Sequence, residues 1–90
     1  MNYDISMNYV YILKSIKDNG FYVGCTLDLE RRLIEHNKGK TKSLKNRRPL
    51  KIVYFEKYDN MQDAYKREKQ IKSYKGGEAF KKLIHDGGFA

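Results

Sequence analysis

The chain has 90 residues and a mass of 10.7 kDa, the size of one small domain. With 40% apolar and 13% aromatic residues and a single proline, it is neither a disordered nor a fibrous chain. Nineteen Lys and Arg residues against eleven Asp and Glu residues give a net charge of +8. A basic balance of this size favours a polyanionic partner; a solvated basic face or an anionic membrane surface are the alternatives.

No apolar run approaches the roughly 20 residues that span a bilayer, so we expect no integral membrane segment. The first residues, MNYDISMNY, lack the basic and apolar regions of a secretory signal. The one cysteine, Cys25, has no partner for an internal disulfide or a structural zinc site. These features predict a cytoplasmic protein. The triplet MNY occurs twice, so translation starting at Met7 would make residues 1–6 dispensable.

The first predicted elements form a β-hairpin. Residues 9–13, YVYIL, are β-branched and aromatic and predict a strand. Residues 18–20, DNG, follow, and Asn-Gly is a strong hairpin-turn signal because both residues tolerate a positive φ. Residues 21–25, FYVGC, form the returning strand. Gly24 within it indicates a bend, or a place where a ligand comes close to the backbone.

A helix is predicted over residues 28–38, with Thr26 or Asp28 as its N-terminal cap and Gly39 as its stop. Its apolar positions recur at helical spacing, at Leu29, Leu33 and Ile34. This spacing predicts that one side of the helix packs on the sheet.

Two polar side chains of this helix, Arg32 and His36, are four residues apart and share one face, whereas Arg31 points elsewhere. The pair could bind a phosphate jointly, with the arginine bidentate. The alternative is an arginine that reaches solvent beside a partly buried histidine. Helical phase alone does not separate the two.

A basic segment without any acid follows the helix. We predict that it forms a loop closed by Pro49 and contacts the phosphates of a nucleic acid. Its seven cations are Lys38, Lys40, Lys42, Lys45, Arg47, Arg48 and Lys51. Without this segment the chain carries a charge of only +1, because seven of the eight net charges lie within it.

The remaining sequence predicts a strand over residues 50–58 and a helix over 61–74 that Asn60 caps. Glycines 76–77 break this helix, and residues 78–85 form a short third one. The order β-β-α-β-α-α predicts an α+β fold, a small three-stranded antiparallel sheet flanked by helices. The predicted boundaries are an N-terminal extension 1–8, a domain 9–86 and a tail 87–90.

A carboxylate interrupts the apolar stripe of the second predicted helix. That stripe consists of Met61, Ala64 with Tyr65, Glu68 and Ile71, whereas Lys66, Arg67, Lys69 and Lys72 fall mostly outside it. An inward carboxylate is unfavourable unless it is paired, hydrogen-bonded or bound to a metal. Glu68 is therefore either half of a structural ion pair or a metal or catalytic group.

Three tyrosines of the predicted hairpin also have more than one possible role. Tyr9 and Tyr11 share one face of their strand, and Tyr22 falls on the neighbouring strand close to Tyr11. Such tyrosines are packing groups, platforms on which bases stack, or groups that position or deprotonate a water.

Together these residues resemble the GIY-YIG nuclease superfamily, and most closely its small stand-alone bacterial members. The name-giving triplets correspond to residues 9–11, YVY, and 22–24, YVG. Arg32 lies ten residues after the second tyrosine, as in the family's helix, and His36 matches its histidine-or-tyrosine position. Glu68 stands in a segment that resembles the helix with the family's single metal-binding glutamate. The resemblance covers nearly the whole chain, from Tyr9 to Ile84.

Three positions depart from the family pattern. The first triplet has Tyr and Val where the family name has Gly and Ile, although its tyrosine is kept. Cys25 stands where some members have a lysine that assists the chemistry. No asparagine follows Asn60, whereas some members carry one near the C-terminus.

The resemblance implies a metal-dependent endonuclease that hydrolyses phosphodiester bonds in DNA. One divalent ion, Mg²⁺ or Mn²⁺, would be held by Glu68. Arg32 would contact the scissile phosphate, and Tyr11 would activate the attacking water. Tyr22 and His36 would hydrogen-bond the phosphate or the water.

The expected partner is therefore a nucleic acid, with no membrane and no small-molecule cofactor. Larger relatives take their target choice from an extra domain, so a separate protein partner is expected to supply specificity here. The alternative is a module that binds structured RNA or DNA without cleaving it.

Overall fold

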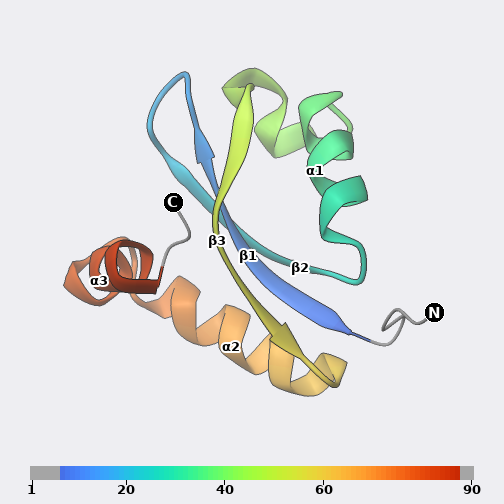
Figure 1. Cartoon of the computed structure of the whole chain (residues 1–90). Helices are drawn as coiled ribbons and strands as arrows, with labels where there is room; N and C mark the ends of the chain where they lie inside the picture. The colour runs from blue at the N-terminus through green and yellow to red at the C-terminus, as the bar shows by residue number, and fades with distance from the viewer. Residues whose placement is uncertain (1–6, 88–90) are drawn as a thin grey trace.

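In a computed structural model, which describes residues 7–87, three antiparallel strands form one sheet in the order β2-β1-β3 (Figure 1). The strands are β1 (Asn8–Ser15), β2 (Phe21–Thr26) and β3 (Leu50–Tyr58). The helices are α1 (Leu29–Asn37), the 3₁₀ helix η1 (Lys42–Arg47), α2 (Met61–Ser73) and α3 (Glu78–Gly87). The predicted α+β fold and element order are confirmed. The expectations for residues 1–6 and 88–90 lie outside the described part.

The sheet is covered on both faces, which explains why its central strand is so apolar. Helices α1 and η1 cover one face, and α2 and α3 cover the other (Figure 1). Within β1 the residues 10–13 are almost completely inaccessible to solvent. Among the described residues no helix combines the length and apolar character needed to cross a bilayer.

Two separate cores result, because alternate residues of β1 point to opposite faces. The core under α2 and α3 contains Val10, Ile12, Val23, Tyr54, Ala64, Ile71 and Phe80. The core under α1 and η1 contains Tyr11, Leu13, Leu44 and Leu50, with Leu29 and Leu33 packed against it. A bulge in β3 shifts the register between the Ile12–Tyr54 and Leu13–Ile52 pairs. Ile34, predicted to join the inner side of α1, is instead exposed.

The hairpin between β1 and β2 is wider than the Asn-Gly signal predicted. The strands end at Ser15 and resume at Phe21, and the Ser15 amide donates to the Gly20 carbonyl at 2.8 Å. Asn19 has a φ of 61°, but Gly20 is not among the residues with positive φ. The Ser15 hydroxyl, which accepts from the amides of Lys17 and Asp18, organises this five-residue loop.

The basic segment is structured, so its prediction as a plain loop was wrong. Residues 42–47 form η1, and Leu44 at its centre is buried against the sheet. A single apolar residue beside the three cations of residues 42–47 gave no helical periodicity, and the helix depends on this one tertiary anchor. The Asp28 cap and the Gly39 stop of α1 are confirmed, with a φ of 82° at Gly39.

Helix α2 contacts the sheet along a narrower row than predicted. Ala64 and Ile71 are buried, but Met61 and Tyr65 are exposed, because a three-stranded sheet offers only a narrow surface. Arg67 and Glu68 flank this row. Arg67 was expected mostly outside the stripe, yet its side chain is only 22% exposed because it leans over β3.

Arg67 leans over β3 because it forms an ion pair with the Glu56 carboxylate on that strand. Glu56 accepts hydrogen bonds from Nε of Arg67 at 2.9 Å and from the hydroxyl groups of Tyr58 at 2.5 Å and Tyr54. Burial by itself raises the pKa of Glu56, but the hydrogen bonds from Arg67, Tyr54 and Tyr58 outweigh it and hold the pKa below its ordinary value. The folded state therefore stabilises the ionised carboxylate.

We predict that Glu56→Gln lowers the free energy of unfolding by about 2–4 kcal/mol at pH 7, because Arg67 loses its partner in a partly buried place. Because the pKa of Glu56 is lower in the folded than in the unfolded state, the ionised carboxylate stabilises the fold. This stabilisation is complete above the pKa of the unfolded state and is lost as the pH falls through the pKa of the folded state. Urea unfolding should therefore show that the difference in free energy of unfolding between the wild type and Glu56→Gln becomes smaller below about pH 4.5. Glu30→Gln, at an exposed site, is the control; an equal effect there would contradict the assignment.

Candidate active site

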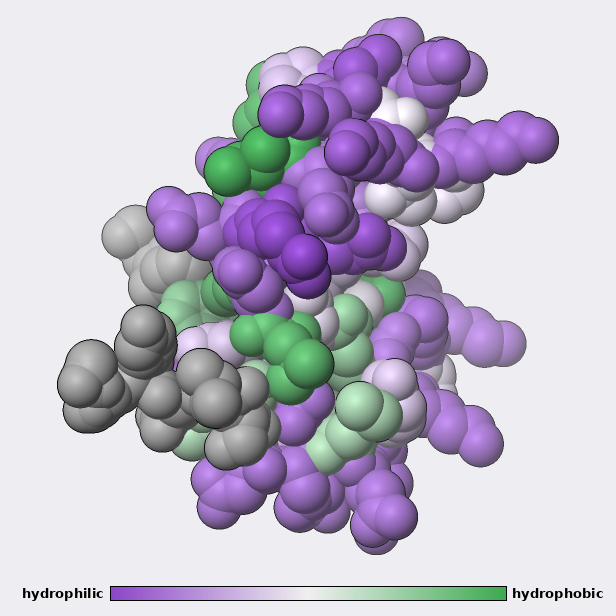
Figure 2. Space-filling view, turned by 90° about the vertical axis from the view of Figure 1, so that its right-hand side faces the viewer, coloured by the Kyte–Doolittle hydropathy of each residue, from purple (hydrophilic) through white to green (hydrophobic). Residues whose placement is uncertain are grey.

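The predicted site residues meet at the edge of the sheet formed by β2. Tyr11 comes from the central strand β1, Tyr22 from β2, Arg32 and His36 from α1, and Glu68 from α2. α1 and α2 lie on opposite faces of the sheet, so the site spans this edge (Figure 1). On the face that Figure 2 shows, polar side chains gather over the upper and lower parts, and hydrophobic side chains lie in the middle.

The first requirement of the site is a close approach between β1 and β2. Tyr11 pairs with Gly24, and a Cβ atom at Gly24 would lie 2.7 Å from the Tyr11 hydroxyl oxygen and 3.1 Å from a ring atom of Tyr22. Such distances are too short for a side chain. The sequence predicted a bend or a ligand near Gly24; the group that approaches is instead the Tyr11 phenol.

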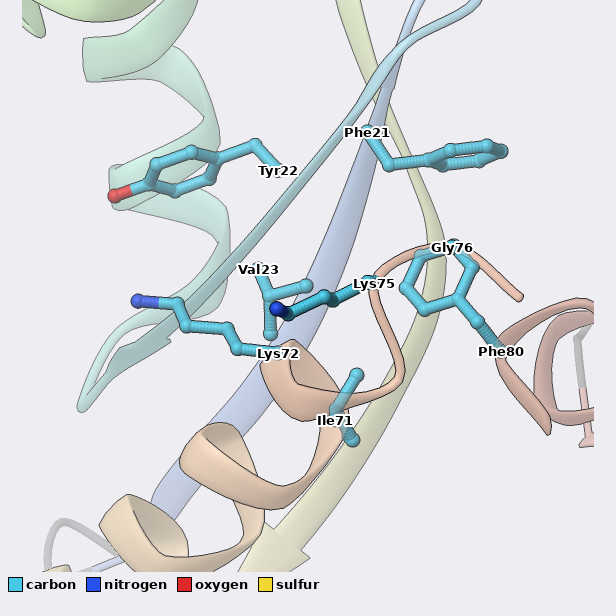
Figure 3. A pocket seen from close by; sticks show the side chains of 8 residues that line it. All are labelled: Phe21, Tyr22, Val23, Ile71, Lys72, Lys75, Gly76 and Phe80. Carbon is cyan, nitrogen blue, oxygen red and sulfur yellow. The ribbon is translucent and has the colours of Figure 1, made fainter.

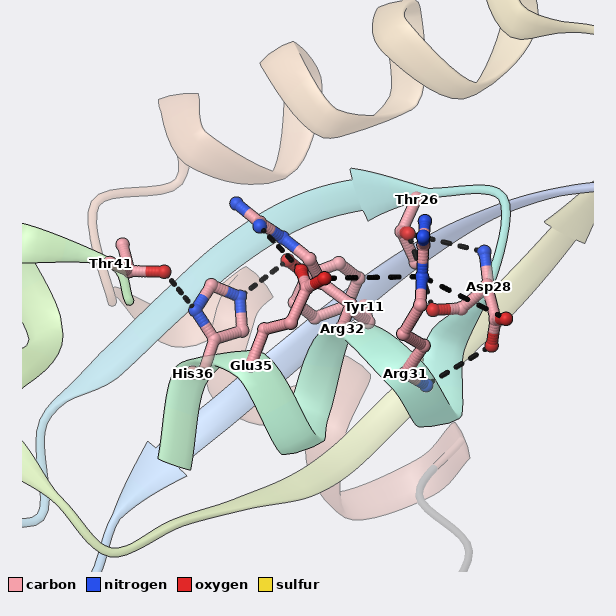
Figure 4. Close-up of polar contacts among 8 residues, drawn as sticks. All are labelled: Tyr11, Thr26, Asp28, Arg31, Arg32, Glu35, His36 and Thr41. Carbon is pink, nitrogen blue, oxygen red and sulfur yellow. Dashed lines mark hydrogen bonds and ion pairs between the residues drawn. The ribbon is translucent and has the colours of Figure 1, made fainter. Parts of the chain in front are cut away.

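Tyr11 and His36 form a buried hydrogen-bonded pair. The Tyr11 hydroxyl lies 2.9 Å from Nε2 of His36, and Oγ1 of Thr41 lies 2.5 Å from Nδ1 (Figure 4). His36 is completely buried. Burial, reinforced by the charge of Arg32, lowers the pKa of His36, so the imidazole is neutral at pH 7.

The neighbouring Arg32 determines the direction of these hydrogen bonds. Its guanidinium interacts with the Tyr11 oxygen and can only donate. The phenol proton is then directed to Nε2 of His36, and Nδ1–H of His36 is directed to Thr41. Burial raises the pKa of Tyr11 to about 12, and Arg32 opposes this rise. A bound anion that drew Arg32 away would raise the pKa of Tyr11 further. Nε2 of His36, as a proton acceptor, favours loss of the phenol proton.

Arg32 and Arg31 differ as the helical phase predicted. Nη1 of Arg32 is held by Glu35 at 3.1 Å, and its side chain is half as exposed as that of Arg31. Arg31 faces solvent and lies 3.9 Å from Asp28. Glu35 therefore aims the guanidinium of Arg32 toward Tyr11, while Arg31 remains outside the site.

Tyr22 completes the aromatic part of the site. Its ring centroid lies 6.3 Å from that of Tyr11 and 5.3 Å from that of His36. The closeness of Tyr11 and Tyr22 that the hairpin predicted is thus present in the structure. Unlike Tyr11, Tyr22 is only partly buried, so its side chain borders the open edge.

Glu68 points to the β2 edge and is paired with a cation. Its carboxylate lies 2.7 Å from the Lys72 ammonium, one helical turn further along α2, and is 20% exposed. Cys25 of β2 lies next to Glu68, and its thiol donates to the Ala64 carbonyl at 3.6 Å. Burial, with Glu68 nearby, raises the pKa of Cys25 to about 12, so the thiol stays neutral. The ion-pair alternative for Glu68 is therefore realised within the site itself.

The donor set around Glu68 fits a hard divalent cation. Within residues 7–87 no group of three or more His, Cys, Asp or Glu side chains is gathered, which excludes a closed zinc-type site there. One carboxylate that leaves most positions to water and phosphate oxygens suits Mg²⁺. The Lys72 ammonium lies 2.7 Å from this carboxylate and occupies the side on which a metal ion would bind.

The seven cations of the basic segment have different surroundings. Arg47 is tied to Asp18 at 3.0 Å, and Arg48 donates to the carbonyl groups of Lys45 at 2.7 Å and Asn37 at 3.3 Å. These two arginines hold the segment to the hairpin and to α1. The exposed lysines are Lys38, Lys40, Lys42, Lys45 and Lys51. The segment also reaches the site, because Thr41 contacts His36.

Comparisons with known proteins identify the family of the chain. Residues 7–81 match the GIY-YIG catalytic domain. A UPF0213 protein of Syntrophus aciditrophicus is 46% identical over 76 residues, which is 82% of this chain and 86% of that one. A UPF0213 protein of Staphylococcus saprophyticus is 42% identical over 81 residues, 89% and 96% of the two chains. The solution NMR structure of a UPF0213 protein from Bacillus halodurans has a TM-score of 0.52 at 30% identity and covers 89% of this chain and 83% of that one.

The fold and the match over residues 7–81 thus define a small single-domain protein of a nuclease class that acts on nucleic acid and generally uses divalent metal ions. The chain belongs to the GIY-YIG family. The relatives that it matches over most of their length carry the name UPF0213.

Three residues around the site were missed by the sequence analysis: Glu35, Thr41 and Lys72. Glu35 and Lys72 each stand three or four residues from a predicted site residue on the same helix, a spacing that indicates an ion pair. Helical spacing therefore carried a signal for both. No local signal identifies Thr41, because it follows α1 and reaches His36 only through the turn after Gly39.

We predict that Gly24→Ala pushes the Tyr11 ring away from His36, because a methyl group there would overlap the phenol. Proton NMR should show loss of the close Tyr11–His36 ring contacts and a lower unfolding temperature. Cys25→Ala, at the next position of β2, should retain these contacts. If Gly24→Ala kept them unchanged, the close approach would not be what positions Tyr11.

Proposed function

We propose that this protein is a divalent-metal-dependent endonuclease that hydrolyses phosphodiester bonds in DNA. The observation that carries the proposal is the hydrogen-bonded Tyr11–His36 pair, with Arg32 beside it, at the same sheet edge as Glu68. A proton acceptor, a phosphate-binding cation and a metal-binding carboxylate are what the reaction needs. Membership of the GIY-YIG family supports the same reaction.

In the proposed reaction, Tyr11 takes a proton from the attacking water while its own phenol proton passes to Nε2 of His36. The water oxygen bonds to phosphorus, the bond to the leaving oxygen breaks, and that oxygen takes a proton from solvent. The neutral state of His36 supports this role, since its lowered pKa leaves Nε2 free to accept. A Tyr11 with a pKa of about 12 would be a poor base without such a partner.

The phosphate would be held by Arg32, with Tyr22 as a hydrogen-bond donor from the exposed side. The guanidinium offers two parallel donors to two phosphate oxygens, and Glu35 keeps it oriented. Glu68 would hold one Mg²⁺ or Mn²⁺ ion. Such an ion supplies Lewis-acid stabilisation of the charge that develops on the phosphate oxygens.

The exposed lysines of the basic segment would contact the DNA backbone on either side of this centre. Such contacts are independent of sequence and position the strand. A hollow of about 480 Å³ lined by Lys17, Lys45 and Arg48 adds a concave basic surface next to η1.

One observation favours the alternative, a module that binds nucleic acid without cleaving it. The Glu68 carboxylate already carries the Lys72 ammonium at 2.7 Å, so a metal ion must compete with it. If that pair persists on substrate, the domain would bind and not cut. The assay below separates the two functions.

We predict nicking of supercoiled DNA with Mg²⁺ or Mn²⁺ and none with EDTA. Glu68→Gln should abolish it, and Arg32→Ala should reduce the rate by about 10²–10³-fold, since a preorganised charge on the phosphate is lost. Arg31→Ala is the matched control on the same helix and should remain within about threefold of the wild type. Activity that survives EDTA, or equal losses at both arginines, would contradict the proposal; binding without nicking would favour the alternative.

We predict that replacing Lys40, Lys42 and Lys45 by Ser flattens the dependence of log affinity on log salt by about two to three units. Each phosphate contact on a duplex contributes about 0.9 to this slope. Arg47 and Arg48 are left in place because they hold the segment. The control removes the same charge from the outer faces of α2 and α3, at Lys66, Lys69 and Lys81. An equal change in the control would mean that the segment is only a solvated surface.

A further inference from the structure

A second hollow, of about 430 Å³, adjoins the candidate active site (Figure 3). It lies between β2 and the junction of α2 and α3, and its floor consists of Phe21, Val23, Ile71 and Phe80. Its volume falls in the range of small-ligand sites, which is about 300–1,000 Å³. None of the roles proposed above uses this floor.

Two phenylalanine rings of the floor pack against each other, and one of them is exposed to solvent. Phe21 and Phe80 pack edge to face, with ring centroids 5.1 Å apart and planes at 69°. Phe80 is buried and holds the pair in place, while Phe21 is 40% exposed on the edge strand. A large apolar ring that is exposed yet held by a buried partner is a suitable surface for stacking.

The rim of the hollow is basic. Lys72 and Lys75 border it, its lining contains no acidic residue, and the Lys14 ammonium lies 5.9 Å from the Phe21 ring centroid. An aromatic floor under a cationic rim is complementary to a flat ring that carries a phosphate. An apolar peptide would offer no anion to the Lys75 ammonium, whereas Lys72 is already paired with Glu68.

The hollow and the active site share two residues. Tyr22 and Lys72 line the hollow, and the same two side chains border His36 and Glu68 respectively. In Figure 3, Tyr22 and Lys72 lie at one end of the hollow and Phe21 and Phe80 at the other. A strand whose phosphate lies at Arg32 would therefore place a neighbouring nucleotide over the hollow.

We propose that this hollow binds an unpaired nucleobase of a DNA strand, stacked on Phe21, with the adjoining phosphate on Lys75. Its place next to a scissile phosphate rests on the proposed endonuclease function. A base in a duplex is already stacked and paired, so it must be flipped out to reach the hollow, which is unfavourable. The protein should thus prefer single-stranded DNA, or unpaired positions in branched DNA, to continuous duplex.

Fluorescence anisotropy without divalent metal tests the base contact independently of cleavage. The probes are a labelled single-stranded oligonucleotide and the same strand with abasic sites, which has equal phosphates and no bases. The wild type should bind the intact strand about 5- to 150-fold more tightly, the range for one base on an aromatic ring. Phe21→Ala should lose most of this preference while its affinity for the abasic strand is unchanged, and Phe21→Tyr should keep it.

Four further variants guard against misfolding and general effects. Phe21→Leu fills the same space without a π face and should also lose the preference; Ile16→Ala, at another exposed apolar residue, should retain it. Lys75→Gln should weaken binding of both strands equally, and more than Lys69→Gln on the outer face of α2. An unchanged preference in Phe21→Ala and Phe21→Leu would overturn the proposal. If the protein bound DNA bases in this way but cut no DNA, the result would contradict the proposed endonuclease function and leave the base-binding proposal intact.

Discussion

The contact of the Tyr11 phenol with the backbone of Gly24 is the constraint on which the rest of the site depends. A tyrosine in the central strand would ordinarily be a packing residue, but here its hydroxyl reaches across the neighbouring strand to the sheet edge. A buried hydroxyl must be hydrogen-bonded, and His36 of α1 supplies the partner at 2.9 Å. One close approach thus links β1, β2 and α1 and determines where the reactive groups can lie.

Helix α2 serves both the fold and the site with two adjacent residues. Arg67 leans toward β3 and neutralises Glu56, while Glu68 leans toward β2 and reaches the site edge. Because α2 lies across a sheet of only three strands, side chains from a single turn of this helix can reach both edge strands. The tightly bonded cluster on the β3 side can hold the helix in register, so that Glu68 keeps its position opposite α1.

The charge of the molecule is organised around this edge in layers. Arg32 lies beside Tyr11 and Lys72 beside Glu68, the lysines of the basic segment lie further out, and Arg47 and Arg48 attach that segment to the fold. The surplus of positive charge is therefore partly structural. Under the proposed function, the exposed lysines are the residues that would contact nucleic acid, since they carry charge without a rigid shape, as sequence-independent backbone contacts require.

The sequence by itself determined the element order and the helix caps, because these follow from local periodicity and capping residues, and the spacing of its motifs named the candidate site residues. It also predicted that Arg32 and Arg31 face different ways, since helical phase is local. Only the tertiary structure decided the partners. The burial of His36 against Thr41, the contact of Tyr11 with His36 and the formation of η1 around Leu44 depend on segments that fold back on one another. No spacing in the chain encodes these contacts, because they form only when α1 and η1 pack on the sheet.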